Sequence, residues 1–187
     1  MALGNNSSSI YLQIMNGKIV RQFKSPTADS VQRTNKNGKV VHEESYGYVE
    51  GHITDISTKE NDMGKFWVVT INDSGTEYKL EFNYSGGVAG AFLKALPNVD
   101  LAEPVRISPK LTVDGDKKKT TVFLNQHGKA AKWFWTKDNP GELPQMKKIK
   151  VKGVESWDDS EQLEYLEKYV KDLLMKALTT NIPQEDF

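Results

Sequence analysis

The sequence contains no cysteine among its 187 residues, which excludes disulfide bonds, thiolate metal sites and cysteine nucleophiles. No apolar run approaches the roughly 18 residues of a membrane-spanning helix, and the first nine residues lack the basic start and apolar stretch of a signal peptide. We therefore expect a cytoplasmic protein without membrane contact. A chain of this length predicts one domain with appendages.

Patterns of catalytic and metal-binding residues are also missing. The three histidines, His42, His52 and His127, are scattered without ligand spacing, so we expect no metal and no other cofactor. The glycine-rich run 86–90 lacks the lysine and hydroxyl residue that complete a nucleotide-binding loop, and no nucleophile elbow occurs. We predict that the protein is not an enzyme. A small hydrolase or nuclease built from dispersed carboxylates stays as an alternative.

Net charge is absent from the whole chain but not from its parts. Residues 106–152 carry twelve basic and four acidic side chains, whereas residues 153–187 carry three basic and nine acidic ones. A basic body followed by an acidic end favours a polyanionic partner for the body and a separate partner for the end.

Turn residues between alternating apolar and polar positions predict a mainly β chain. Asn16-Gly17 predicts a tight hairpin turn, and the polar segment 24–39 predicts a mobile loop or arm. Strands are expected over 10–15, 18–23, 46–56, 65–71, 76–84, 104–113, 120–125 and 129–136, the third to fifth of them forming a meander. Helical spacing of apolar residues predicts a short helix over 86–96.

The C-terminal part is expected to be a basic connector over 136–152, an amphipathic helix and an acidic tail. Apolar residues spaced three and four apart predict the helix from Asp159 to about Thr179, packed on the rest of the protein. We divide the chain into a β domain over 1–152, a helical segment over 153–179 and a tail over 180–187.

The predicted order of a meander, a short helix and further strands occurs in the OB-fold, a five-stranded Greek-key barrel, although other small antiparallel barrels share part of it. The core over 46–136, with Gly64-Lys65-Phe66-Trp67, and the acidic ending at Phe187 resemble OB-fold single-stranded DNA-binding proteins of bacteriophages and bacteria. The phage type is favoured because a long Gly/Gln-rich linker is missing, and the C-terminal helix departs from the family pattern.

The resemblance implies a DNA-binding protein of replication or recombination in a bacterial host cell, without sequence preference. It also implies that the tail residues Glu185, Asp186 and Phe187 bind replication or recombination proteins. The alternative is a non-enzymatic protein-interaction or assembly module on the same barrel, with a homodimer formed through the C-terminal helix.

Single-strand binding requires cations for phosphates and aromatic faces for bases. In the expected strand 129–136, Trp133 and Trp135 share one face while Lys132 and Phe134 share the other, and one of these faces belongs to the core. The alternatives without a ligand are that each aromatic residue packs in the core and that the triplet Lys117, Lys118 and Lys119 is only a solvated hairpin tip. The candidate DNA-binding residues are Tyr46, Tyr48, His52, Lys65, Trp67, Lys110, Lys117, Lys118, Lys119, Lys129, Lys132, Trp133 and Trp135.

Overall fold

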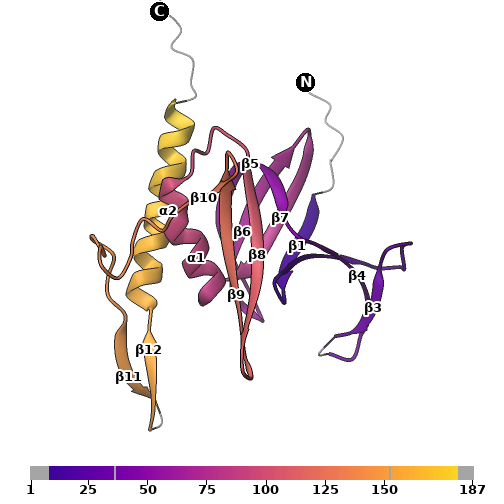
Figure 1. The fold of residues 1–187 in the computed structure, drawn as a ribbon, viewed down its shortest axis with the longest axis horizontal. Helices are drawn as coiled ribbons and strands as arrows, with labels where there is room; N and C mark the ends of the chain where they lie inside the picture. The colour runs from indigo at the N-terminus through magenta and orange to yellow at the C-terminus, as the bar shows by residue number, and fades with distance from the viewer. Residues whose placement is uncertain (1–8, 36, 152, 181–187) are drawn as a thin grey trace, which may run out of the picture.

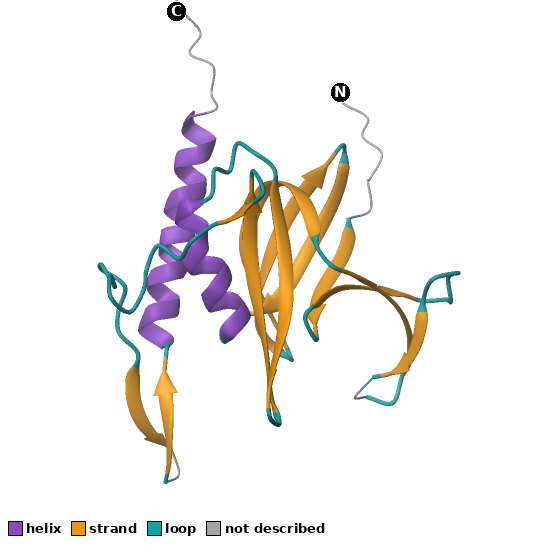
Figure 2. Cartoon of the chain, in the orientation of Figure 1, coloured by secondary structure: helices purple, strands orange, loops and turns teal. Residues whose placement is uncertain are grey.

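The computed structural model describes residues 9–35, 37–151 and 153–180. Figure 1 shows one large sheet at the centre with two helices on one side of it, and Figure 2 distinguishes the two kinds of element by colour. The expected mainly β class is confirmed. The elements are β1 (Ile10–Met15), β2 (Lys18–Phe23), β3 (Val31–Thr34), β4 (Val40–Tyr46), β5 (Val49–Asn61), β6 (Gly64–Asp73), β7 (Thr76–Asn83), α1 (Gly87–Ala95), the 3-10 turn η1 (Leu96–Asn98), β8 (Val105–Asp114), β9 (Lys117–Gln126), β10 (Lys129–Ala130), β11 (Lys147–Val151), β12 (Val154–Asp158) and α2 (Ser160–Thr180).

Ten strands form one mixed sheet in the order β10-β9-β8-β5-β6-β7-β1-β2-β4-β3. β1 runs parallel to β7, with Ile10 opposite Tyr78, and the other pairs that the structure describes are antiparallel. The long strand β5 pairs with β8 through its first residues and with β6 through the rest, and a register shift between Ile53 and Asp55 bends it. A closed barrel is not found among the described residues.

The tight turn that the sequence predicts at Asn16-Gly17 joins β1 to β2. Both turn residues have positive φ angles, 49° and 73°, as a two-residue hairpin of this type requires. A Cβ atom placed on Gly17 would lie 2.4 Å from the backbone nitrogen of Leu111 in β8. Glycine therefore serves both the turn and the close approach of the hairpin to β8.

The predicted meander is confirmed as β5, β6 and β7, and the two predicted helices are confirmed as α1 and α2. β5 and β6 are longer than expected, because their turns begin only at Asn61 and Asp73, whereas β7 ends one residue earlier than expected, at Asn83. The core between the sheet and the helices is built around fully buried Trp67, Phe92, Ile71, Leu80 and Ile107. Within the described ranges, no helix has both the length and the apolar character that crossing a bilayer requires.

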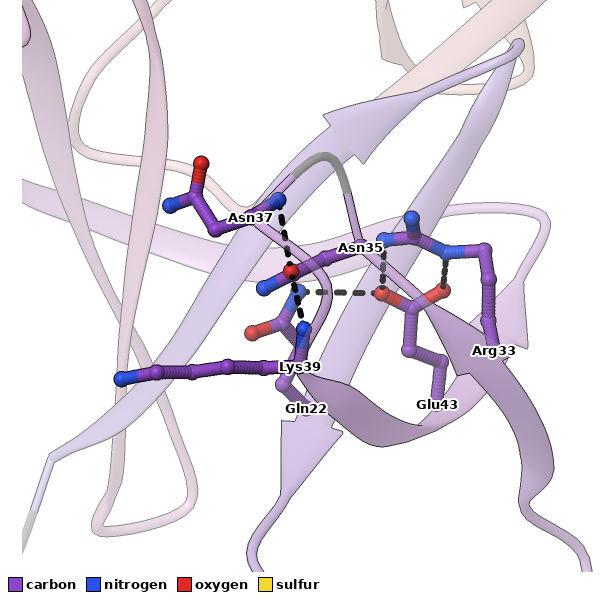
Figure 3. A network of polar contacts seen from close by, with 6 residues as sticks. All are labelled: Gln22, Arg33, Asn35, Asn37, Lys39 and Glu43. Carbon is purple, nitrogen blue, oxygen red and sulfur yellow. Dashed lines mark hydrogen bonds and ion pairs between the residues drawn. The ribbon is translucent and has the colours of Figure 1, made fainter.

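The expected loop over 24–39 is partly wrong, because β3 forms within it and pairs with β4. Nε and Nη2 of Arg33 donate to the two carboxylate oxygens of Glu43 at 2.9 and 2.6 Å, which links β3 to β4 through their side chains. The Asn35 side chain accepts hydrogen bonds from the backbone of Asn37 and Lys39 and closes the turn (Figure 3). Charged and polar cross-strand contacts replace the apolar alternation by which strands are recognised in sequence. With β2 these strands form a curved arm at one edge of the ten-stranded sheet (Figure 1).

The expected strand over 129–136 is wrong beyond Ala130, where β10 ends. The backbone of Phe134 donates to the carbonyl oxygen of Lys94 in α1 at 2.7 Å, so the segment leaves the sheet to follow the helix. Trp135 then turns into the core, with 3% of its surface exposed, whereas Trp133 and Phe134 stay 46% and 49% exposed. The predicted sharing of one face by Trp133 and Trp135 is therefore also wrong.

The expected basic connector over 136–152 ends in a strand, which agrees with the alternation of Lys147, Lys148 and Lys150 with Ile149 and Val151 that is also typical of a charged edge strand. Lys147–Val151 form β11, which pairs with β12 in a hairpin that projects from the base of α2 (Figure 1). α2 packs on the core through Leu163, Leu166 and Val170, and the Tyr169 ring meets Trp135 edge to face at 5.0 Å.

Candidate nucleic-acid interface

The outer face of the β8–β9 hairpin brings cations and an aromatic ring together. Along β8, Arg106 and Lys110 point outward while Val105 and Ile107 are buried, as strand alternation requires. On β9, Phe123 points outward between buried Val122 and Leu124. The register sets Phe123 opposite Ser108, between the two cations of the neighbouring strand.

Tyr48, the residue directly before β5, adds a second ring beside this face. Tyr48 is 49% exposed, and the Arg106 guanidinium lies 4.1 Å from the centre of its ring. Nε and Nη2 of Arg106 lie 2.9 and 2.7 Å from the same carboxylate oxygen of Glu50. The hydrogen bond to Glu50 raises the pKa of Arg106 above its ordinary value, so this guanidinium stays charged. Tyr48 and Arg106 are thus held in a fixed arrangement.

Two adjoining hollows follow this surface. A groove of about 540 Å³ runs over β8 and β9 past Arg106, Lys110 and Phe123; we call it the β8–β9 groove. A cavity of about 630 Å³ lies between the arm and β5, and we call it the tyrosine cavity because Tyr46, Tyr48 and Tyr78 line it. Glu50 and Pro104 line both hollows, which are therefore neighbours along one surface.

Several predicted site residues meet on this surface. Tyr46, Tyr48 and His52 line the tyrosine cavity, and Lys110 lines the β8–β9 groove. The predicted triplet Lys117, Lys118 and Lys119 is exposed at the turn between β8 and β9, where Lys118 and Lys119 line a third hollow towards α1.

Two predicted stacking residues do not lie on this surface. Trp67 is 1% exposed, stacks on Tyr84 with the ring centres 5.4 Å apart, and donates from its indole nitrogen to the Tyr84 carbonyl oxygen. Trp135 is buried with it in the core. Both rings stabilise the fold in this structure and present no face to a ligand.

The remaining predicted residues are dispersed. Lys65 forms an ion pair with Glu167 of α2 at 2.6 Å, so its charge is used within the protein. Trp133 lies beside α1 with the Lys94 amine 5.8 Å from its ring centre, and burial lowers the pKa of Lys94. Lys129 and Lys132 are exposed on β10 and just after it. The predicted tail residues Glu185, Asp186 and Phe187 lie outside the described residues.

Sequence reasoning missed Arg106 and Phe123 as site residues. Arg106 could have been identified from the alternation of Arg106, Ser108 and Lys110 with buried residues, which makes one face of the strand cationic. Phe123 could not be assigned to the same face without the register of β8 with β9.

Among the described residues, no three or more histidine, aspartate or glutamate side chains gather in a way that could hold a metal ion. Comparisons of the chain with protein-family models, with curated proteins and with solved structures gave no match.

Proposed function

We propose that the protein binds single-stranded DNA without sequence preference, with the strand lying in the β8–β9 groove. The observation that carries the proposal is the placement of two exposed rings, Tyr48 and Phe123, beside Arg106 and Lys110 on one sheet face. Rings on which bases stack and cations that follow the phosphates are the two components of such sites.

The lysine triplet adds positive charge at the end of the hairpin, where Lys118 and Lys119 line the hollow towards α1. Lys117, Lys118 and Lys119 are exposed, and no ion pair to them occurs among the described residues. Each phosphate contact they make releases counterions, so binding should weaken as salt rises.

The order of elements supports the same proposal through an OB-like core. β5, β6 and β7 form a meander, α1 follows, and β8 and β9 return so that β5 pairs with both β6 and β8. In an OB-fold, too, the strand that precedes the rest of the meander is long and pairs on both sides. Oligonucleotides are common ligands of this fold. The departure is β1, which pairs with β7 at the edge where a barrel would close.

The corresponding role is that of an accessory protein of phage-type replication or recombination that performs no bond chemistry. Residues Glu185, Asp186 and Phe187 would recruit partner proteins, because an aromatic ring with adjacent carboxylates suits an apolar pocket with a basic rim. A protein-interaction module is the second candidate. It is favoured by the projecting β11–β12 hairpin, where Val154 and Trp157 are 68% and 57% exposed.

The test is a fluorescence-anisotropy titration of labelled oligothymidylate at two salt concentrations. We expect Lys110→Ala to weaken binding and to reduce the slope of log affinity against log salt by about 0.7, the value for one phosphate contact on a single strand. Lys168→Ala is the matched control, because Lys168 is an exposed lysine of α2 away from the groove. The absence of any binding at low salt would overturn the proposal and favour the interaction module.

Deletion of residues 184–187 is a second arm of this titration. If the acidic tail competes with DNA for the cationic groove, the shortened protein should bind more tightly, and the gain should shrink as salt rises. Unchanged affinity would separate the tail from the DNA-binding surface.

A further inference from the structure

The tyrosine cavity combines an apolar floor with an aromatic rim. Leu12, Ile19 and Val49 at its floor are buried core residues. Tyr46 and Tyr48 at the rim are 40% and 49% exposed. The volume of about 630 Å³ lies within the range of roughly 300 to 1,000 Å³ found for small-ligand sites.

Both rim rings are held in place before any ligand arrives. The Tyr46 hydroxyl donates to the carboxylate of Glu44, which also accepts a hydrogen bond of 2.6 Å from the Thr27 hydroxyl. These hydrogen bonds lower the pKa of Glu44, so the acceptor stays ionised. Tyr48 is fixed from the other side by Arg106. Preorganised rings lose little conformational entropy when a planar ligand stacks on them.

The charges around the two hollows suit different parts of a nucleotide. Glu50 and Asp73 line the tyrosine cavity with Arg21 as its cation, so its interior disfavours a phosphate but offers carboxylate acceptors to a neutral base. The adjoining groove is lined by Arg106 and Lys110 against Glu50, which pairs with Arg106, so Lys110 leaves an excess positive charge that favours a phosphate there. Glu50 and Pro104 form the wall that the two hollows share. A base would pass this wall to enter the cavity while the DNA backbone stays in the groove.

One wall of this cavity is formed where the backbones of two strands pack closely. Gly51 has a φ angle of 156°, and a Cβ atom placed on it would lie 2.6 Å from the carbonyl oxygen of Asn72. β5 therefore approaches β6 directly at the cavity wall. The space above this wall is left to Tyr46, Tyr48 and His52.

We propose that the tyrosine cavity is a nucleobase site, in which one unstacked base lies between Tyr46 and Tyr48 while its phosphate stays at the mouth, in the β8–β9 groove. This inference rests on the proposed function where the base belongs to a bound strand. The same chemistry would accept a free nucleoside monophosphate.

The first experiment is photocrosslinking of the full chain to an oligothymidylate that carries one 5-iododeoxyuridine, followed by peptide mapping. This base crosslinks to aromatic side chains in stacking contact with it. We expect crosslinks on Tyr46 or His52, because Tyr48 also lies beside the groove cation Arg106 and would not distinguish the two sites. Bound oligonucleotide that crosslinks only to Phe123 or outside the cavity would overturn the inference and leave the proposed function intact.

Variants of Tyr46 test the contribution of the ring. Stacking on one aromatic side chain predicts roughly 5- to 150-fold weaker oligothymidylate binding for Tyr46→Leu. Tyr46→Phe keeps the ring but loses the hydrogen bond to Glu44, so it should weaken binding much less than Tyr46→Leu does. Tyr11→Leu is the matched control, because Tyr11 is 58% exposed on β1 but does not line the cavity. Equal affinity of Tyr46→Leu and the wild type would contradict the site.

Titration with thymidine monophosphate, followed by NMR, separates the two sources of the base. Shifts of Tyr46 and Tyr48 resonances without oligonucleotide binding would retain the cavity as a free-nucleotide site and overturn the proposed function. Absence of both kinds of binding would overturn both proposals.

Discussion

Glu167 joins α2 to the sheet, and its neutralisation should make the protein less stable at neutral pH. Its carboxylate accepts hydrogen bonds from the Lys65 amine at 2.6 Å, the Tyr84 hydroxyl at 2.7 Å and the Lys171 amine at 3.1 Å. Tyr84 in turn stacks on buried Trp67, so the contact continues into the core. Glu167→Gln keeps the shape of the side chain and removes its charge.

The magnitude follows from the pKa of Glu167. Burial disfavours the ionised form, but the hydrogen bonds from Lys65, Tyr84 and Lys171 outweigh it and lower the pKa from 4.5 to about 2. At about 1.4 kcal/mol for each pKa unit, this shift corresponds to at most about 3 kcal/mol of unfolding free energy, and solvent screening of the partly exposed Lys65 makes the contribution of ionised Glu167 smaller than that. Because the pKa is lower in the folded protein, this contribution is complete above about pH 5. It is lost as the pH falls through 4.5 towards 2.

The assay is urea unfolding at a series of pH values from 7 to 2.5, followed by circular dichroism and tryptophan fluorescence. We expect Glu167→Gln to be less stable than the wild type by up to about 3 kcal/mol at pH 7, with the difference shrinking below pH 4.5. Glu164→Gln is the control, since Glu164 is exposed on the same helix and its replacement should change stability by less than about 0.5 kcal/mol. Parallel pH profiles for the wild type and Glu167→Gln would refute the reasoning.

Three further predictions concern the core, the hairpin and the lysine triplet. Trp135→Ala should lower the free energy of unfolding by about 3 to 5 kcal/mol, measured by denaturant titration, because a buried ring in contact with α2 leaves a cavity. Gly17→Ala should lower the melting temperature, since position 17 combines a φ angle of 73° with the close approach of β8; an unchanged value would contradict that packing. Replacing Lys117, Lys118 and Lys119 together by serine should reduce the salt slope of oligothymidylate binding by up to about 2, and an unchanged slope would place the hairpin tip away from the phosphates.

The parts of the fold that the sequence predicts are those specified by local signals. The Asn16-Gly17 turn, the meander and both helices depend on turn chemistry and on the spacing of apolar residues within single elements. β3 escaped prediction because the ion pair of Arg33 with Glu43, rather than an apolar face, supports it. The path of Trp135 into the core follows from a backbone hydrogen bond to α1, which leaves no trace in the order of residue types.

The candidate site was only partly predictable for a related reason. The sequence shows that Tyr46, Tyr48 and Lys110 are of residue types suited to binding. It does not show which residues lie beside them, because this depends on which strands pair. The contact of Tyr48 with Arg106 joins residues far apart in the sequence, through the pairing of Glu50 with Arg106 in β5 and β8. Trp67 illustrates the converse, since an aromatic residue beside a lysine in a strand is equally typical of the core.

The parallel pairing of β1 with β7 has a consequence for synthesis of the chain. The edge of β1 that pairs with β7 stays unpaired until Tyr78, which lies opposite Ile10 and 68 residues later, has been synthesised. At a translation rate of about 5 to 20 residues per second, the β1–β2 hairpin spends about 3 to 14 seconds with that edge unpaired. During this interval Leu12 and Ile19, buried in the finished protein, have no core to enter. The N-terminal hairpin is therefore the segment that most needs protection from aggregation on the ribosome.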